Sequence, residues 1–221
     1  MADAAVIALP WSAGGSTPIR LDRLIFGLTI PETTHPREDP QETRAIAAIR
    51  GGDEGAYDYL VTKYLKRVVS VAWNIVRNAH DAEDLAQEAF VRAYRNLNRF
   101  REGEPFGPWI YRIVTNLALD VVKHQSRFRH EEITGQEPAA RRDLANLPAE
   151  TNELAMRIDA ALESLPEMQR VVARLSLVEG FDHPEIAGMM GLSEGTVRSH
   201  LSLARRKLRE KLNDLYEGPD D

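Results

Sequence analysis

Residues 81–97 read DAEDLAQEAFVRAYRNL, residues 98–109 read NRFREGEPFGPW and residues 110–129 read IYRIVTNLALDVVKHQSRFR. In the first segment the apolar residues recur at steps of three and four, which predicts a helix with one buried face. These residues are Ala82, Leu85, Ala86, Ala89, Phe90, Ala93 and Leu97. The last segment is also helical in pattern, and we expect a helix over about 106–125. An acidic helix, an aromatic loop and a basic helix therefore follow one another.

The acidic helix has its carboxylates concentrated near its start. Asp81, Glu83 and Asp84 occupy the first turn, where the positive end of the helix dipole stabilises negative charge. Gln87 and Glu88 continue this polar side along the helix. Such a face suits a basic protein partner, although a solvated surface with no partner explains the composition equally well.

The aromatic loop carries three large rings, Phe100, Phe106 and Trp109. Core packing is the default role of each ring, and the sharper alternative is that at least one of them stacks on a nucleic-acid base. The following helix carries Arg112 and Lys123, and such cations suit phosphate groups. The loop and this helix therefore form a candidate nucleic-acid surface.

The composition restricts the class of protein. Of the 221 residues, 43% are hydrophobic and 28% are charged, and there is no cysteine. The lack of cysteine excludes disulfides, zinc sites built from thiolates and thiol catalysis. No apolar run approaches the roughly 20 residues of a membrane span, and Asp3 stands where a secretory signal would carry Lys or Arg. We therefore expect a cytoplasmic protein without membrane insertion.

The net charge of −6 alone would argue against nucleic-acid binding, but the charge is distributed unevenly. Residues 92–129 carry eight Lys and Arg against three carboxylates, a balance of +5. Residues 196–212 also have a balance of +5, since six cations face only Glu210. Residues 130–167 hold nine carboxylates and three Arg, a balance of −6. We infer two basic contact surfaces separated by an acidic connector.

The hydrophobic periodicity divides the chain into two helical parts. Residues 1–38 show no sustained period and contain several Gly and Pro, which predicts a mostly irregular extension. Helical patterns fill residues 39–126 and 151–214. We expect a flexible acidic linker at 127–150 and a short tail at 215–221. Within the extension, residues 21–30 could form a short strand or a turn of helix, but no strand-like alternation of any length occurs. The predicted fold is all-α, with two small helical domains.

Residues 183–211 read HPEIAGMMGLSEGTVRSHLSLARRKLREK, the pattern of a helix-turn-helix. Ala187 is small enough for two helices to cross closely, and Gly191 can adopt the left-handed conformation that ends the first helix. Ser193 can cap the second helix. The inward side of that helix would carry Val197, Leu201, Ala204 and Leu208.

The exposed side of the second helix supplies candidate DNA contacts. The candidates for contacts with base edges are Thr196, Arg198, Ser199, His200 and Ser202. Arg205 and Arg206 suit phosphates. The alternative is an ordinary pair of helices whose basic surface is solvated, but the agreement of cap, turn, inward face and charge favours DNA binding.

The sequence contains no recognisable enzyme or metal motif. No Ser-His-Asp order, phosphate-binding loop or pair of catalytic carboxylates stands out. A di-iron site needs a Glu followed three residues later by His, but Glu83 is followed by Ala86 and Glu88 by Val91. We predict no catalytic residue, no metal and no cofactor.

Four segments closely resemble the extracytoplasmic-function (ECF) sigma factors of the bacterial sigma-70 family. They are DAEDLAQEAFVRAYRNLNRF, FGPWIYRIVTNLALD, ALESLPEMQRVVARL and EIAGMMGLSEGTVRSHLSLARRKL. The resemblance covers about residues 40–213 and preserves the order of the family's two halves, while the segment before residue 40 is longer than the family usually carries. It implies a sigma-2-like bundle, a sigma-4-like helix-turn-helix domain and a role as a dissociable specificity subunit of RNA polymerase in transcription initiation.

The resemblance also implies roles for particular residues. The β′ clamp helices of core polymerase would be contacted by Asp84, Gln87 and Glu88. The −10 DNA would be held by Phe100, Phe106, Trp109, Arg112, Asn116, Asp120 and Lys123. The −35 element would be read by Ser193, Thr196, Arg198, Ser199, His200, Ser202, Arg205 and Arg206. Further implied partners are the polymerase β flap and an anti-sigma factor that holds the protein inactive.

Two positions depart from the family pattern. His200 and Leu203 stand where family members often carry Arg, so the −35 sequence preference does not transfer.

Two other classes of protein remain open as alternatives. One is an autonomous helix-turn-helix regulator whose first domain senses a ligand or dimerises. The other is a sigma mimic that sequesters an anti-sigma factor, and the intact segment SEGTVRSHLSLARRKL argues against it.

Overall fold

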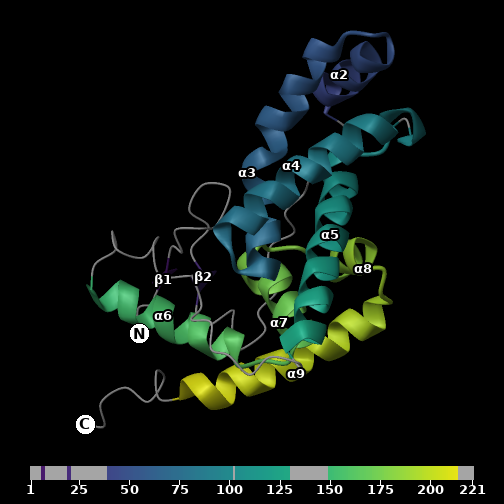
Figure 1. The fold of residues 1–221 in the computed structure, drawn as a ribbon. Helices are drawn as coiled ribbons and strands as arrows, with labels where there is room; N and C mark the ends of the chain where they lie inside the picture. The colour runs from purple at the N-terminus through teal and green to yellow at the C-terminus, as the bar shows by residue number, and fades with distance from the viewer. Residues whose placement is uncertain (1–5, 8–18, 21–38, 102, 130–148, 214–221) are drawn as a thin grey trace. The chain divides into compact units, whose positions relative to one another are not determined.

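The computed structural model describes residues 6–7, 19–20, 39–101, 103–129 and 149–213. The chain divides into two compact units. Apart from one pair of two-residue strands, the regular elements of the described residues are helices (Figure 1). The predicted all-α fold class is confirmed.

The first unit is built on three long helices that pack against one another, α3, α4 and α5. Its elements in chain order are α2 (Pro40–Arg50), η1 (Glu54–Ala56), α3 (Tyr57–Val76), α4 (Ala79–Asn96), η2 (Leu97–Arg99) and α5 (Phe106–Arg129). The shorter α2 contacts both α3 and η2. It therefore reaches the end of α4 and the start of the aromatic connection to α5.

The core of the first unit combines large side chains on α3 and α5 with small ones on α4. Ala82, Ala86 and Ala89 of α4 are fully buried, and such small residues let neighbouring helices approach closely. Leu60 of α3 and Ile110 of α5 are also fully buried. Each such aliphatic side chain contributes about 1.5–3 kcal/mol. The buried face predicted for the acidic helix is thus confirmed.

α4 begins at Ala79, two residues before the acidic segment that predicted it. The cap is Asn78, whose side-chain oxygen accepts a hydrogen bond from the Asp81 amide at 3.2 Å. Just before it, Arg77 has a φ of 60°, and its guanidinium lies 3.6 Å from the centroid of the Trp73 ring. This cation–π contact helps to hold a residue other than glycine in the left-handed region.

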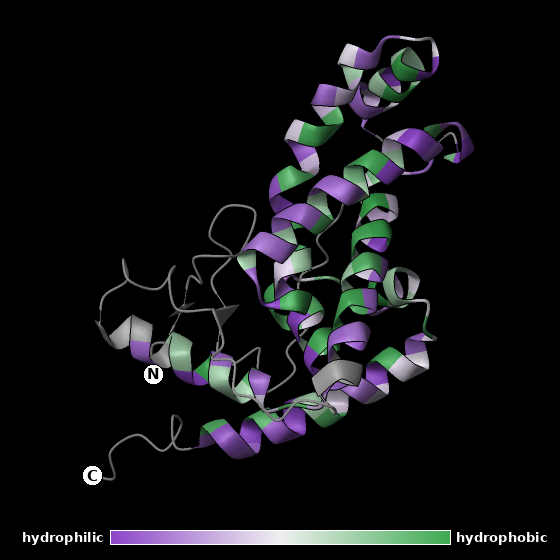
Figure 2. Ribbon diagram, viewed as in Figure 1, coloured by the Kyte–Doolittle hydropathy of each residue, from purple (hydrophilic) through white to green (hydrophobic). Residues whose placement is uncertain are grey.

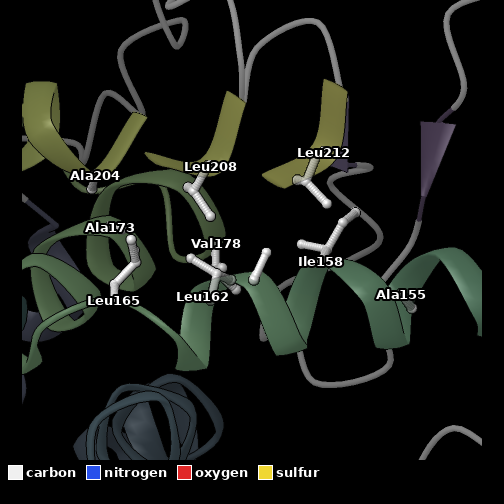
Figure 3. Packing of buried hydrophobic residues seen from close by; sticks show 10 residues of the cluster. Ala155, Ile158, Leu162, Leu165, Ala173, Val178, Ala204, Leu208 and Leu212 are labelled. Atoms are coloured by element: carbon white, nitrogen blue, oxygen red, sulfur yellow. The ribbon is translucent and has the colours of Figure 1, made fainter. Parts of the chain in front are cut away.

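The second unit contains α6 (Ala149–Glu163), α7 (Glu167–Ala173), most of α8 (His183–Met190) and α9 (Glu194–Leu212). Its core includes a cluster that joins α6 to α9. Figure 3 shows Ile158 and Leu162 of α6 on the side that faces Leu208 and Leu212 of α9, and all four side chains are nearly inaccessible to solvent. Figure 2 shows hydrophobic residues recurring along the otherwise largely hydrophilic α9, the pattern of a helix with one buried face.

Arg174 is fully buried in the second unit, which the sequence did not predict. It begins a π-helical segment (η3, Arg174–Val178) that continues α7. One guanidinium nitrogen lies 2.7 Å from a carboxylate oxygen of Asp159 and 2.8 Å from one of Glu163. A guanidinium is tolerated in a core when carboxylates replace its lost hydration. These ion pairs tie α6 to the end of α7.

The helices extend beyond the predicted domain limits. α5 continues to Arg129 and α6 begins at Ala149, so both helices enter the predicted linker at 127–150. The remaining linker and the predicted tail lie outside the described residues.

The predicted irregular extension contains one short element of regular structure. β1 (Val6–Ile7) and β2 (Ile19–Arg20) pair antiparallel, with Val6 opposite Arg20. The rest of residues 1–38 lies outside the described part of the chain. The sequence missed this pair because two residues are too few to show the alternation of a strand.

None of the helices in the described residues has the combination of length and apolar character that crossing a membrane requires.

Candidate functional site

The acidic side of α4 is exposed but not free of intrahelical partners. The side chain of Asp84 is 62% exposed and lies 3.8 Å from His80, one turn earlier. Glu88 is 46% exposed and accepts a hydrogen bond from the Arg92 Nε at 2.6 Å. An exposed ion pair such as Glu88–Arg92 contributes only about 0–1 kcal/mol. A basic partner could therefore replace His80 and Arg92 at little cost.

An apolar residue completes this acidic face. Val91 lies three residues after Glu88 and four after Gln87, so it belongs to the same side of α4. Its exposed fraction is 41%, which is high for a valine in a helix that packs on two others. Its exposure is not evident from the sequence, because one valine among polar residues leaves the helical period unchanged. We call Asp84, Gln87, Glu88 and Val91 the α4 face.

The basic helix presents a second exposed surface. Arg112, Asn116, Asp120 and Lys123 are all exposed. Their spacing of four, four and three residues places them on one side of α5. Trp109 precedes Arg112 by three residues and is half-buried. We call these five residues the α5 face.

Two of the three aromatic rings that were predicted to contact DNA are buried. Phe106 is fully buried and Phe100 is 6% exposed. The ring centroids of Phe100 and Phe106 lie 4.9 Å and 5.6 Å from that of Trp109. The two phenylalanines therefore pack in the core and present no free ring face to a base. Trp109 alone of the three retains partial exposure beside the exposed cations.

The turn of the helix-turn-helix has the predicted geometry. Gly191 has a φ of 67°, in the left-handed region that favours glycine. The Ser193 Oγ accepts a hydrogen bond from the Thr196 amide at 3.1 Å and so caps α9. The predicted inward residues Val197, Leu201, Ala204 and Leu208 are at most 1% exposed.

α8 has a cap that was not predicted from the sequence. The Asp182 carboxylate accepts from the Glu185 amide at 2.8 Å, and the Glu185 carboxylate accepts from the Asp182 amide at the same distance. This reciprocal pair is a capping box, and the spacing of an Asp and a Glu three residues apart could have revealed it. Both helices of the motif therefore begin at defined residues.

The candidate DNA-reading residues differ in accessibility. Those exposed on α9 are Arg198, Ser199, Ser202 and Arg206, whereas Thr196, His200 and Arg205 are half-buried. The Ser193 and Thr196 hydroxyl oxygens lie 2.8 Å apart, so the hydrogen-bonding capacity of Ser193 is used at the helix start. Burial lowers the pKa of the Arg205 guanidinium, which remains cationic at neutral pH.

Across the described ranges there is no group of three or more His, Cys, Asp and Glu residues arranged to hold a metal ion.

The α4 face, the α5 face and the exposed side of α9 fall within segments shared with known proteins. Residues 60–128 match sigma-70 region 2, and residues 155–208 match sigma-70 region 4. The chain is 33% identical over 219 residues to the ECF RNA polymerase sigma factor SigE of Mycolicibacterium smegmatis, an alignment that covers 94% of this chain and 81% of that protein. It is 30% identical over 181 residues to the ECF sigma factor SigW of Bacillus subtilis, covering 78% of this chain and 97% of SigW.

The chain belongs to the sigma-70 family of transcription initiation factors and, within it, to the ECF RNA polymerase sigma factors. Members of this family are not enzymes.

Solved structures show the same fold. The structure of CnrH in complex with the cytosolic domain of CnrY aligns with a TM-score of 0.57 and 25% identity, and covers 79% of this chain and 98% of CnrH. The sigma factor RpoE of Bartonella quintana, solved in complex with the anti-sigma factor NepR, aligns with a TM-score of 0.54 and 23% identity over 71% of this chain and 96% of RpoE.

Proposed function

We propose that this chain is a dissociable subunit that binds core RNA polymerase and directs it to promoters with −35 and −10 elements. The observation that supports this most is the pair of exposed surfaces on the two matched regions. Region 2 carries the α5 face, and region 4 carries a capped helix with exposed Arg198 and Arg206. As a partner of polymerase, the protein would act in the cytoplasm.

The −35 element is assigned to α9. A recognition helix places its N-terminal residues against base edges in the major groove. Arg198, in the first half of α9, is exposed and can make a bidentate contact with guanine. Arg206 lies two turns further along and suits a phosphate. Ser199 donates its hydroxyl to the Gly195 carbonyl at 2.9 Å, so it would need to rotate to contact DNA.

The −10 element is assigned to the α5 face. Opening a promoter requires a base to leave the duplex stack, which costs a few kcal/mol unless a protein surface holds it. Trp109 supplies a partly exposed ring for stacking, and Asn116 can hydrogen-bond a base edge. Arg112 and Lys123 suit the phosphates of the displaced strand. Phe100 and Phe106 are left out of this assignment because they are buried.

Core polymerase is assigned to the α4 face. Its carboxylates suit the basic clamp helices of the β′ subunit, and Val91 adds an exposed apolar contact at its C-terminal end. The second unit would contact the β flap. The family resemblance supports both assignments.

An anti-sigma factor is the remaining partner. CnrH was solved in complex with the cytosolic domain of CnrY, and RpoE in complex with the anti-sigma factor NepR. We propose that this chain is also held inactive by a protein that covers its polymerase-binding surfaces.

The test is co-elution of the purified chain with bacterial core RNA polymerase, followed by transcription from a promoter selected from random DNA. We expect a stable complex and initiation at a defined start site. A chain that binds no polymerase but binds duplex DNA as a symmetric dimer would be an autonomous regulator. A chain that binds neither polymerase nor DNA, but captures an anti-sigma factor, would be a sigma mimic.

A further inference from the structure

α2 holds both ends of the connection between η2 and α5. The helix ends at Arg50, before the region 2 match begins at residue 60. At one end of the connection, the Glu42 Oε1 accepts a hydrogen bond from the Phe106 amide at 2.6 Å. At the other end, the Arg50 guanidinium donates to the carbonyl of Leu97 at 3.2 Å and to that of Phe100. These contacts join residues that are 47 to 64 positions apart in the chain.

Glu42 satisfies a backbone group that α5 cannot satisfy itself. Phe106 is the first residue of α5, so its N–H has no acceptor within the helix. A carboxylate at this position also interacts favourably with the positive end of the helix dipole. Glu42 is only 4% exposed, so its charge requires further partners. Those partners are the Lys63 ammonium at 2.9 Å and the Tyr64 hydroxyl.

Lys63 is itself held by a second carboxylate. The Asp39 Oδ2 lies 2.5 Å from the Lys63 Nζ and accepts from the Tyr59 hydroxyl at 3.0 Å. Burial alone would lower the pKa of Lys63, but its hydrogen bonds to Asp39 and Glu42 raise it above the ordinary value. Lys63 is therefore a fixed cation between two carboxylates, and Glu42 has little freedom to change its position.

The sequence near Phe106 permits this close approach. A Cβ atom added to Gly107 would lie 3.1 Å from the Tyr64 ring and 3.3 Å from the Tyr111 ring. A side chain at this position would push the Tyr64 or Tyr111 ring away by a few tenths of an ångström, so glycine lets Tyr64 of α3 lie close to the first turn of α5 while its hydroxyl contacts Glu42. The start of α5 is fixed from two sides, by Glu42 and by Tyr64.

Arg50 plays the corresponding part at the end of α4. Carbonyl groups at the end of a helix have no intrahelical donor, and a basic side chain can satisfy them. One guanidinium nitrogen of Arg50 serves both the Leu97 and the Phe100 carbonyl. It thereby sets the direction in which the chain leaves η2 toward the aromatic cluster.

We propose that Glu42 and Arg50 are positioning residues for promoter opening. By fixing both ends of the connection, they hold Trp109 and the α5 face in the geometry that receives a displaced −10 base. A site held in its binding geometry before the DNA arrives loses less ordering entropy on binding. This inference rests on the proposed function, since it concerns the −10 surface assigned above.

The first test asks whether the contacts of Glu42 and Arg50 with the connection exist in solution. Arg50→Ala should leave the helices folded but accelerate hydrogen exchange of amides in residues 97–106 by about tenfold, because a charge-assisted contact is removed. Arg44→Ala is the matched control, since Arg44 is an exposed arginine on the same helix. Glu42→Gln conserves size but leaves the Phe106 amide or Lys63 without its carboxylate acceptor, and should accelerate exchange at the start of α5. Unchanged exchange in both variants would overturn the proposal.

The second test separates positioning from folding. Each variant is combined with core polymerase on the selected promoter, and unpaired thymines are detected by permanganate. Arg50→Ala and Glu42→Gln should co-elute with polymerase as the wild type does, yet give about tenfold less open promoter than Arg44→Ala. Faster exchange with normal opening would mean that the contacts serve stability alone and would overturn the proposal. If the wild type itself neither binds polymerase nor opens the promoter, the proposed function fails, and the inference fails with it.

Discussion

The two units hold their candidate DNA surfaces in different ways. On α9 the residues that shape the surface are neighbours in sequence, since Ser193 caps the Thr196 amide three positions later. On α5 the first amide is held by Glu42, which is 64 residues away. The first arrangement is local, and the second depends on packing between distant segments. A helix cap made by a residue three positions away can be predicted from a single sequence. A hydrogen bond between residues 64 positions apart can be identified only from the folded structure.

The largest expected effect comes from disrupting the α6–α9 core that supports the candidate DNA surface of α9. Leu162→Ala removes a fully buried side chain from the α6–α9 core and should cost about 2–5 kcal/mol. Hydrogen exchange of α9 amides measures this loss. Leu203→Ala, at a 37% exposed position of α9, should change exchange far less. Equal effects of the two substitutions would show that α9 does not depend on α6.

A smaller effect tests whether α9 reads sequence. Arg198→Ala should cost about 1–3 kcal/mol of binding at the −35 element if the guanidinium contacts a base. Holoenzyme binding to the selected promoter and to versions with altered −35 sequence measures the discrimination. An equal loss on every sequence would instead assign Arg198 to a phosphate.

Charge reversal on α4 tests the polymerase surface. Asp84→Arg places a cation where basic clamp helices are expected, and should weaken the polymerase complex about tenfold, or ~1.4 kcal/mol. Titration of core polymerase with labelled protein gives the affinity. Asp53→Arg makes the same change of charge at an exposed position outside the α4 face. Similar losses for both variants would point to overall charge rather than to a defined surface.

The smallest effect concerns the acid stability of the Asp39–Lys63–Glu42 cluster. Hydrogen bonds from Lys63 and the Gln41 amide lower the pKa of Asp39 from its ordinary 3.8 to about 2. Its stabilising contribution is therefore complete above about pH 4 and is lost as the pH falls toward 2. Asp39→Asn should flatten this part of the stability curve, measured by denaturant unfolding between pH 2 and pH 5. Asp53→Asn, whose side chain caps no helix, should leave the curve unchanged.

The predictions that were confirmed concern features that depend on residues close together in the sequence. The left-handed Gly191, the Ser193 cap and the four inward residues of α9 are confirmed, because short-range backbone chemistry determines each of them. Phe100 and Phe106 were assigned to DNA, but they are buried. An aromatic ring in a loop gives no periodic signal that separates core from surface.

Charged residues inside the units were missed for a related reason. Glu42 and Arg174 are almost fully buried, although carboxylates and guanidinium groups are usually exposed. Each is stabilised by partners from other helices, and a single sequence does not show that pairing. The α4 and α5 faces were predicted as polar sides of helices, but Val91 and the pairing of Glu88 with Arg92 came from the structure.

The most direct test of the central claim is the pattern of bases selected from random DNA by this chain together with core polymerase. Two DNA-reading units on one subunit predict two separated sequence elements, with Arg198→Ala relaxing only the upstream one. A single symmetric element, selected equally well without polymerase, would contradict the account and identify an autonomous regulator.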